Sequence, residues 1–313
     1  MSVIHVESPG LLTTVQDLGR EGFGPLGVSA SGAADAVSLR LANRLAANPE
    51  DAAGLEMTLL GGTFGFPQGA TIALTGSDFG ATLDGAPLPL WKSMEVRTGQ
   101  KLRVGSTRSG ARCYLCVHGG IVVKPFLGSA STHLLSGLGG HHGRALRKGD
   151  VLHIGPPTAS LEKRAVAAQV LEHLSPRKTL RVTPGPQNDL FPDAAQQRFY
   201  RSTYRVAEES NRMGLRLEGP HLTHGPSGEM VTEGVSVGAV QITAAGLPII
   251  LFVEQQTTGG YAKIANVIAA DLHSLGQLRP RDEIRFEQVD WDIARALLVE
   301  QEKLLASDKL ILE

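Results

Sequence analysis

The chain has 313 residues, a length that favours two domains over one. Of these residues, 42% are hydrophobic and 19% charged, a composition typical of a folded globular protein. The formal net charge of −1 gives no electrostatic reason to expect a nucleic acid or an anionic membrane as a partner. No apolar run reaches the roughly 20 residues of a membrane-spanning helix. The N-terminus also lacks the basic start and apolar middle of a signal peptide, so we expect a cytoplasmic protein.

The 37 glycines and 17 prolines predict many short strands joined by turns. The first strands are expected at residues 3–6 and 11–15. A helix with one apolar face is expected over residues 34–45, with Ser29 and Ser31 as candidate N-caps.

The polar loop 16–24 between these elements carries Asp17 and Arg20. Together with Asp35 they are candidates for a site. Equally, Asp17 and Arg20 could form a loop ion pair, with Asp35 in the first turn of the helix. The sequence leaves both interpretations open.

More strands follow, each bounded by Gly, Pro or Asp, and their spacing predicts an antiparallel sheet or barrel. They are expected at residues 55–60, 71–75, 81–84, 101–105 and 113–117. Asp84 and Gly85 indicate a hairpin turn. Cys113 and Cys116 form a C-x-x-C pattern, but an offset of three in a strand puts them on opposite faces. We therefore expect two buried thiols and no redox or metal site.

A long loop of small residues over 128–144 contains the adjacent His141 and His142. Adjacent histidines cannot easily bind one ion on a regular element, and no paired carboxylate or helical second histidine accompanies them. We expect a flexible glycine loop and no bound metal.

We predict a first domain at residues 1–156, a linker at 157–178, a second domain at 179–289 and a C-terminal helical segment at 290–313. Within the second domain, a helix is expected at 193–202. A strand with a polar face is expected around residues 215–217, where Arg216 could pair with Glu218 at the surface.

The stretch 247–271 is central to the predicted site. The apolar run 247–253 predicts a buried strand, and a polar turn with Gly259 and Gly260 follows it. Apolar residues then recur at helical spacing and predict a helix that begins near Ala262. These residues are Ile264, Val267, Ile268, Leu272 and Leu275. A helix N-terminus next to Lys263 would bind a carboxylate, carbamate or phosphate, whereas the alternative is that the two glycines only make a tight turn.

Two parts of the chain follow a similar plan. The glycine pair at 119–120 is followed by an alternating strand at 151–154, and the pair at 259–260 by one at 283–286. This suggests a pseudo-duplicated architecture. Ser236 lies in a G-x-S-x-G pattern, but the residues after it predict a strand where a nucleophile elbow requires a helix.

Seven ordered blocks resemble the biotin-dependent carboxyltransferase family, also called allophanate hydrolase subunit 2, over residues 3–288. The blocks are residues 13–20, 42–43, 55–58, 119–121, 127–132, 211–216 and 256–261. The resemblance implies a mainly β fold with a few helices, arranged as two cyclophilin-like β-barrel domains. The chain has no Met-Lys pair of the kind that carries biotin, so we expect no covalent biotin on it. Where relatives carry an aspartate before the Gln-Thr-Thr block, this chain has Glu254-Gln255, and a proline expected after Gln241-Ile242 is Thr243.

The resemblance implies an enzyme subunit in an ATP-dependent 5-oxoprolinase complex, which hydrolyses 5-oxo-L-proline to L-glutamate. The implied partners are a KipI-like protein and a LamB/YcsF-like protein, which form the other subunits, and ATP is used by the complex. One alternative is a carboxyltransferase subunit of a urea- or allophanate-type system that acts on biotin carried by another polypeptide. Another is a non-catalytic antagonist that binds a KipI-like protein.

Hydrolysis of an activated lactam needs donors for an oxyanion or phosphate, an arginine for the substrate carboxylate and a carboxylate that moves protons. The candidates for the anion are Gly259, Gly260 and Lys263, those for the carboxylate are Arg212 and Arg216, and those for acid–base catalysis are Glu254 and Asp17. Further candidate binding residues come from the family blocks. They are Arg20, Asn43, Thr257, Thr258 and Tyr261.

Overall fold

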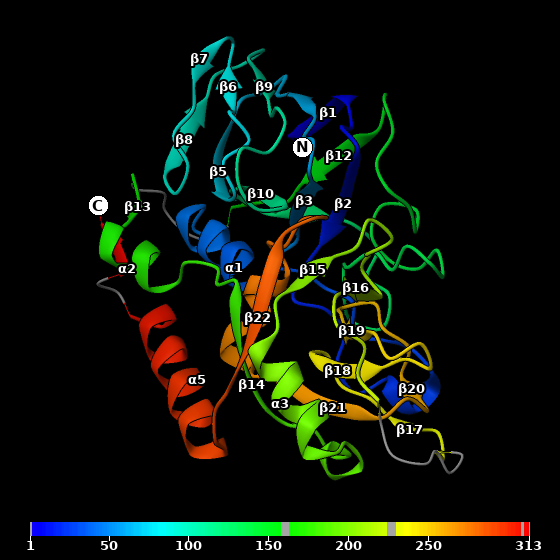
Figure 1. The fold of residues 1–313 in the computed structure, drawn as a ribbon. Helices are drawn as coiled ribbons and strands as arrows, with labels where there is room; N and C mark the ends of the chain where they lie inside the picture. The colour runs from blue at the N-terminus through cyan, green and yellow to red at the C-terminus, as the bar shows by residue number, and fades with distance from the viewer. Residues whose placement is uncertain (1, 158–162, 224–229, 308–309, 313) are drawn as a thin grey trace. The chain divides into compact units, whose positions relative to one another are not determined.

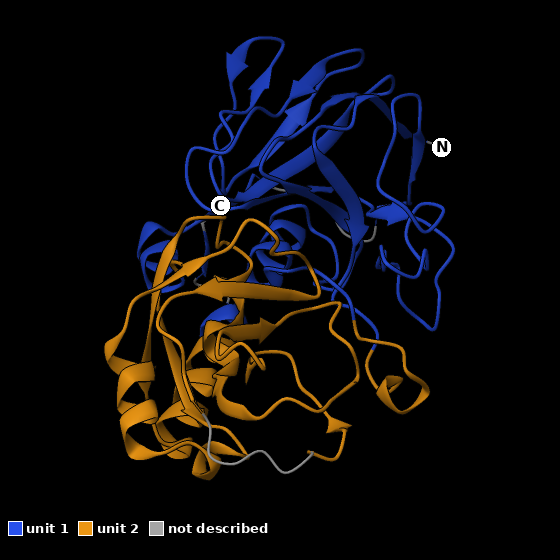
Figure 2. Ribbon diagram, turned by 45° about the vertical axis from the view of Figure 1, so that its right-hand side comes forward, with its two compact units in different colours: residues 1–20, 31–174, 304–313 blue, residues 21–30, 175–303 orange. Residues whose placement is uncertain are grey.

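The computed structural model describes residues 2–157, 163–223, 230–307 and 310–312. The chain divides into two compact units (Figure 2). Unit 1 comprises residues 1–20, 31–174 and 304–313, and unit 2 comprises residues 21–30 and 175–303. The predicted domain boundaries and the pseudo-duplication stay predictions, and part of the predicted linker, residues 158–162, lies outside the described residues.

Most strands of unit 1 lie in a seven-stranded and a five-stranded antiparallel sheet (Figure 1). The seven-stranded sheet has the order β11 (Ile121–Val122), β12 (Val151–Ile154), β1 (Val3–Ser8), β4 (Thr63–Gly65), β9 (Lys101–Arg103), β6 (Thr82–Leu83) and β7 (Ala86–Pro87). The five-stranded sheet has the order β2 (Leu12–Gln16), β3 (Gly54–Thr58), β10 (Arg112–Val117), β5 (Ala70–Gly76) and β8 (Ser93–Val96). The strands predicted from the sequence over residues 3–117 are therefore present, and β4, β7 and β8 were missed.

Strand β10 contributes to two hydrophobic clusters, because all six of its residues are buried and successive side chains point to opposite faces. Cys113 packs in one cluster with β1 and β3, whereas Cys116 packs in the other with α1 (Ala36–Leu45). Both cysteines are free, and burial raises the pKa of both thiols. The prediction of two buried thiols on opposite faces is confirmed.

Helix α1 begins one turn later than its candidate caps. Its N-cap is Asp35, whose carboxylate accepts hydrogen bonds from Ser38 N at 2.9 Å and Ser38 Oγ at 2.6 Å. The prediction of Ser29 or Ser31 as the cap is wrong, because the chain becomes helical only at Ala36. The hairpin predicted at Asp84 and Gly85 joins β6 to β7, and both residues have positive φ, 48° and 87°, as a type I′ turn requires.

The C-terminal segment returns to unit 1. The two-stranded sheet of β13 (Ala165–Val166) and β23 (Ile311–Leu312) adjoins the short helix α2 (Ala168–His173). Leu305 and Leu310, which are 1% and 0% exposed, belong to the same hydrophobic cluster as α1 and α2. Unit 1 is therefore built from both ends of the chain.

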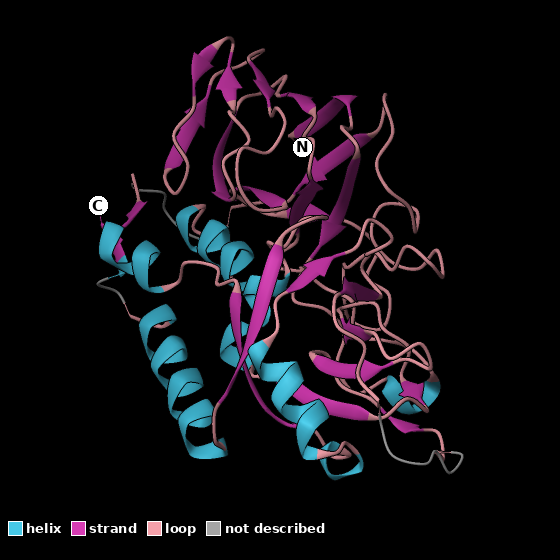
Figure 3. Ribbon diagram, viewed as in Figure 1, coloured by secondary structure: helices cyan, strands magenta, loops and turns pink. Residues whose placement is uncertain are grey.

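Unit 2 is a closed barrel, and together with the sheets of unit 1 it confirms the mainly β prediction (Figure 3). The barrel order is β14 (Thr179–Pro184), β21 (Lys263–Val267), β18 (Ala239–Ile242), β19 (Pro248–Leu251), β16 (Gly214–Glu218), β15 (Tyr204–Val206) and β22 (Glu283–Gln288). It closes through a parallel pairing of β14 with β22. Outside the barrel, β17 (Glu233–Gly234) pairs with β20 (Thr258–Gly259).

Helix α3 (Asp193–Arg201) belongs to unit 2, and α5 (Trp291–Leu305) begins in unit 2 and ends in unit 1; they confirm the predictions at 193–202 and at the C-terminus. The remaining helical turns are η1 (Gly24–Leu26), η2 (Asn188–Leu190), η3 (Ala269–Asp271) and α4 (Leu272–Leu275). Strand β18 follows Ser236, as predicted, so the nucleophile elbow is absent there. No helix in the described ranges has both the length and the apolar character that a membrane crossing requires.

The helix predicted to begin near Ala262 is wrong. Residues Lys263–Val267 form β21, which lies between β14 and β18 in the barrel. Both faces of this strand are largely covered, with Ile264 and Ala265 each 0% exposed. A short apolar run that is buried on both faces has no clear period, so helical spacing is a weak signal there. The run before it is a strand as predicted, at β19.

Candidate functional site

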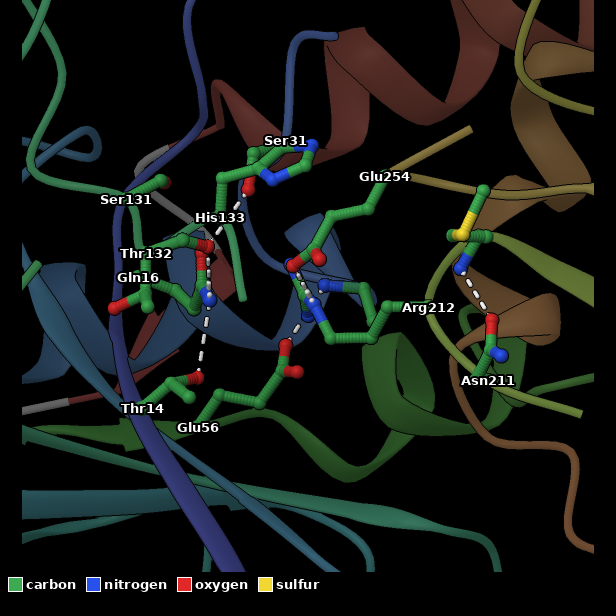
Figure 4. A network of polar contacts seen from close by, with 12 residues as sticks. Thr14, Gln16, Ser31, Glu56, Ser131, Thr132, His133, Asn211, Arg212 and Glu254 are labelled. Carbon is green, nitrogen blue, oxygen red and sulfur yellow. Dashed lines mark hydrogen bonds and ion pairs between the residues drawn. The ribbon is translucent and has the colours of Figure 1, made fainter. Parts of the chain in front are cut away.

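A buried ion pair joins Arg212 and Glu254 at one end of the β16–β19 pair (Figure 4). Gly214 and Leu251 are register partners in these antiparallel strands. The backbone pairing continues beyond them, with Phe252 N donating to Met213 O at 3.0 Å and Glu254 N to Arg212 O at 2.8 Å. The guanidinium Nε of Arg212 then donates to the carboxylate of Glu254, and the two residues are only 4% and 3% exposed. The guanidinium predicted to bind a substrate carboxylate is therefore engaged by a carboxylate of its own chain.

The second candidate arginine, Arg216, has an exposed side chain on β16. Its suggested surface partner, Glu218, pairs with Arg205 instead, with Arg205 Nη2 2.5 Å from Glu218 Oε2. Of the two candidate arginines, Arg212 is the buried one, and it lies beside the acid that the sequence also singled out.

Lys263 is buried at the start of β21, and Glu233 compensates its charge. Its Nζ lies 2.6 Å from Glu233 Oε1 and 3.4 Å from Tyr261 O. Gln187 Nε2 also donates to Glu233 Oε1 at 2.6 Å. The hydrogen bond from Lys263, followed by that from Gln187, lowers the pKa of Glu233. The predicted anion site at a helix N-terminus is wrong, because the backbone here is a strand and the lysine is already ion-paired.

The Thr-Thr-Gly-Gly-Tyr segment forms one strand of a small surface ribbon, which we define as residues 233–235 and 257–259. Thr257 O accepts a hydrogen bond from Val235 N at 3.1 Å, and Gly259 pairs with Glu233. Tyr261 is 46% exposed, and Gly260 is partly exposed. Gly259 therefore lies in a strand and Gly260 in the connection between β20 and β21, and no helix starts there.

Two glutamines beside this ribbon were not among the site residues predicted from the sequence. Gln241 and Gln255 are 1% and 8% exposed. Gln241 Nε2 and Gln255 Oε1 have no hydrogen-bond partner within the part of the chain that the structure describes. The sequence contained a weak signal, because both positions adjoin the places where this chain departs from the family pattern.

In unit 1, Asp17 holds two loops together. Its carboxylate accepts hydrogen bonds from Gly19 N at 2.8 Å, Ser129 Oγ at 2.7 Å and Ala130 N at 2.6 Å, and also from Ser131 Oγ. Arg20 donates to the backbone carbonyls of Ser131 and Phe126 and stacks over the Phe126 ring. These contacts make both residues anchors of the 126–131 segment.

Asn43 is likewise an anchor. It is 0% exposed, and its Nδ2 donates to Ala52 O at 2.7 Å and Glu50 O at 3.2 Å, so it ties the end of α1 to the following loop. The same unit carries a line of polar contacts shown in Figure 4. Gln16 Nε2 donates to Thr14 Oγ1 and Thr132 O, and Ser31 Oγ also donates to Thr132 O.

The sequence also did not predict a buried network of polar contacts around Glu56 in unit 1. Glu56, which is 1% exposed, accepts hydrogen bonds from Tyr114 Oη at 2.7 Å and Ala34 N at 2.8 Å, and Arg112 Nε lies 3.3 Å away. Burial, followed by the charge of Glu56, raises the pKa of Tyr114. Nothing in the spacing of these residues could have predicted that β3 and β10 would bring them together.

The loop with His141 and His142 is anchored by Asp150. Arg144 Nη1 and Nη2 donate to the two Asp150 oxygens at 2.8 and 2.9 Å, and His141 Nε2 lies 3.6 Å from the same carboxylate. The hydrogen bond from Arg144 lowers the pKa of Asp150, whereas burial lowers that of His141. A surface depression of about 610 Å³ lies next to both histidines. Among the described residues, no group of three or more His, Cys, Asp or Glu side chains could hold a metal ion.

With this geometry in view, comparison with known proteins identifies the family. The family model described as carboxyltransferase domain, subdomain A and B, matches residues 26–288. The chain belongs to this carboxyltransferase-domain family. The resemblance drawn from the sequence blocks is confirmed.

Relatives in this carboxyltransferase-domain family fall into two groups. The chain is 38% identical over 301 residues to the C subunit of 5-oxoprolinase from Escherichia coli, a match that covers 96% of each protein. It is 34% identical to urea amidolyase from Saccharomyces cerevisiae, where the match covers 98% of this chain and 18% of the relative. The crystal structure of the Kluyveromyces lactis urea carboxylase matches with a TM-score of 0.91 and 33% identity, and covers 99% of this chain and 30% of that chain.

Proposed function

We propose that this chain is a subunit of an ATP-dependent 5-oxoprolinase complex that hydrolyses 5-oxo-L-proline to L-glutamate. Its partner subunits in this proposal are a KipI-like protein and a LamB/YcsF-like protein. The observation that supports it most directly is the match to the C subunit of 5-oxoprolinase, which extends over 96% of that relative. The match to yeast urea amidolyase, by contrast, covers 18% of that much longer protein.

The side chains of unit 2 suggest which part of the reaction this chain serves. Lys263 is neutralised by Glu233, and the helix N-terminus expected to bind phosphate is a strand. Arg212 and Glu254 form a buried charged pair at the end of the barrel strands, where the guanidinium can hold the Glu254 carboxylate in position to accept a proton. In the proposed complex, this chain contributes to binding and proton transfer at the lactam, and its partner proteins bind the nucleotide.

A second candidate is a carboxyltransferase that acts on biotin carried by another polypeptide. The match to urea carboxylase, with a TM-score of 0.91 over 99% of this chain, favours it. Lactam hydrolysis and carboxyl transfer to or from biotin both need donors for a carbonyl or carbamate oxygen and a group that moves a proton. The two reactions therefore place similar demands on the same side chains.

The test is glutamate release from 5-oxo-L-proline with ATP by the three co-purified proteins, with and without this chain. We expect the activity to require this chain and to fall by about 10²- to 10⁴-fold in Glu254→Gln, the range for loss of a general acid or base. Arg205→Met, which alters only an exposed ion pair, serves as the matched control and should leave the rate unchanged.

Each result separates the candidates. Activity that persists without this chain contradicts the 5-oxoprolinase proposal. Carboxyl transfer to urea from a carboxylated biotin carrier would then support the second candidate. Binding of the KipI-like protein with neither activity would leave the antagonist as the function.

A further inference from the structure

Two amide side chains in unit 2 are buried with part of their hydrogen-bonding capacity unused. Gln241 is 1% exposed and Gln255 is 8% exposed. Within the described residues, Gln241 Nε2 lacks an acceptor and Gln255 Oε1 lacks a donor. A buried polar group left in this state costs about 1–3 kcal/mol, so two in one region call for a physical reason.

Both amides lie against the same surface ribbon, residues 233–235 and 257–259. Gln255 Nε2 donates to Val235 O at 3.1 Å, which leaves its Oε1 as the free atom. A Cβ atom on Gly259 would lie 2.8 Å from Gln241 Nε2 and 3.4 Å from Val235 Cγ1. Glycine at 259 therefore lets the ribbon lie directly on the Gln241 amide.

The ribbon itself faces solvent. Glu233, Gly234 and Thr258 are exposed. Val235 N donates to Thr257 O across the ribbon, and Glu233 is tied to the barrel by Lys263 and Gln187. Because the ribbon buries little apolar surface of its own, its movement costs mainly the Gln255–Val235 hydrogen bond and the Glu233–Lys263 ion pair. Movement of the ribbon would uncover one free N–H donor and one free carbonyl acceptor.

One donor and one acceptor match the edge of a cis amide, where a ring carbonyl stands next to a ring N–H. A five-membered lactam has this edge, and so does a cyclic urea. Resting on the proposed function, we propose that Gln241 and Gln255 bind the ring amide of the lactam substrate beneath the ribbon. Gln241 Nε2 donates to the ring carbonyl, and Gln255 Oε1 accepts from the ring N–H.

The proposal is tested with the reconstituted complex carrying Gln241→Met or Gln255→Met in this chain. Methionine keeps the length of glutamine and removes the amide. Loss of one hydrogen bond to the ring should raise the KM for 5-oxo-L-proline by about 10- to 100-fold. The unfolding midpoint of the chain should stay the same or rise, because the substitution removes an unsatisfied buried group.

Gln301→Met is the matched control. Gln301 is 8% exposed, like Gln255, but its Nε2 donates to Ala270 O at 2.9 Å. This variant should lower the unfolding midpoint and leave KM unchanged. A purely structural role of Gln241 and Gln255 would make their variants behave like Gln301→Met, and that result would overturn the proposal.

Ring analogues test the two contacts separately. N-methyl-5-oxoproline lacks the ring N–H, so it should bind the wild-type chain more weakly than 5-oxo-L-proline does. This difference should disappear in Gln255→Met and persist in Gln241→Met, as measured by calorimetry on the isolated chain. If the wild-type chain, Gln241→Met and Gln255→Met all show the same difference in affinity between the two rings, the assignment of Gln255 is wrong.

Free biotin distinguishes the two sources of a cis amide edge. The wild-type chain could bind biotin and not 5-oxo-L-proline, with biotin binding lost in Gln241→Met. This result would assign the subsite to a cyclic urea and contradict the lactam proposal. A complex that needs this chain but tolerates both methionine variants would contradict only the subsite. A complex that works without this chain would contradict the proposed function, and the calorimetry would still decide the subsite.

Discussion

The side chains of Arg212 and Glu254 show which contacts can be predicted from residue type alone and which cannot. Arginine was expected to bind a carboxylate, and it does, but the carboxylate belongs to Glu254 of the same chain. Spacing along the chain could not predict this contact, because it depends on the register of β16 with β19. The sequence singled out both residues as candidates, whereas their pairing required the fold.

Breaking this ion pair should be costly. Arg212→Met or Glu254→Leu each removes one member of a buried ion pair, so each should lower the free energy of unfolding by about 3–5 kcal/mol. The double variant should lose less free energy of unfolding than the sum of the two single losses, as measured by urea denaturation. Arg205→Met breaks an exposed pair and should cost no more than about 1 kcal/mol. Additive losses would show that the two side chains do not interact.

Asp150 should make the stability of the protein depend on acidic pH. Hydrogen bonds from Arg144 lower its pKa below the usual 3.8, so the folded state favours the carboxylate. This contribution is complete above the unfolded pKa and is lost as the pH falls through the folded one. Asp150→Asn should therefore destabilise the protein by about 1.5–3 kcal/mol at pH 7. The gap in unfolding free energy between the two proteins should narrow below pH 3.8; a constant gap from pH 7 to pH 3 would contradict the assignment.

At the scale of elements, long strands and amphipathic helices follow from the pattern of apolar residues, but short buried strands do not. Helix α5 exposes one face to solvent, and its pattern predicts it well. In β21, the neighbouring strands on both sides and the covered faces remove the alternation that identifies a strand. The candidate anion site required a helix N-terminus near Ala262. Because residues Lys263–Val267 form a strand, that helix N-terminus is absent.

The glycine loop over 137–143 offers a direct test of how an irregular element is held. Gly137 and Gly139 both have φ of 63°, but a Cβ on Gly137 would find its nearest neighbour at 3.8 Å, whereas one on Gly139 would lie 2.2 Å from Ser131 O. Gly137→Ala should cost about 1–2 kcal/mol for the left-handed backbone alone. Gly139→Ala should cost clearly more, because the loop must also move away from Ser131. Equal losses in thermal unfolding would show that the loop is not packed there.

At the scale of the whole molecule, the sequence predicted a linker at residues 157–178 between two domains, but it did not indicate that unit 1 includes the last ten residues. Sequence patterns report local periodicity, whereas the position of Leu305 and Leu310 in the cluster around α1 depends on contacts more than 250 residues away along the chain. The same limit explains why the family and its mainly β fold could be predicted, but not the side-chain contacts within each unit.

The C-terminal segment should therefore stabilise unit 1. Leu305 and Leu310 are 1% and 0% exposed, and truncation of a buried leucine to alanine costs about 2–5 kcal/mol. Leu310→Ala, like removal of residues 304–313, should lower the unfolding free energy of unit 1, measured by hydrogen exchange at the amides of α1. Trp291→Ala changes a side chain that is 67% exposed on the same C-terminal helix, and it should have an effect within about 0.5 kcal/mol. Protection in α1 that survives the truncation would show that unit 1 is complete without the end of the chain.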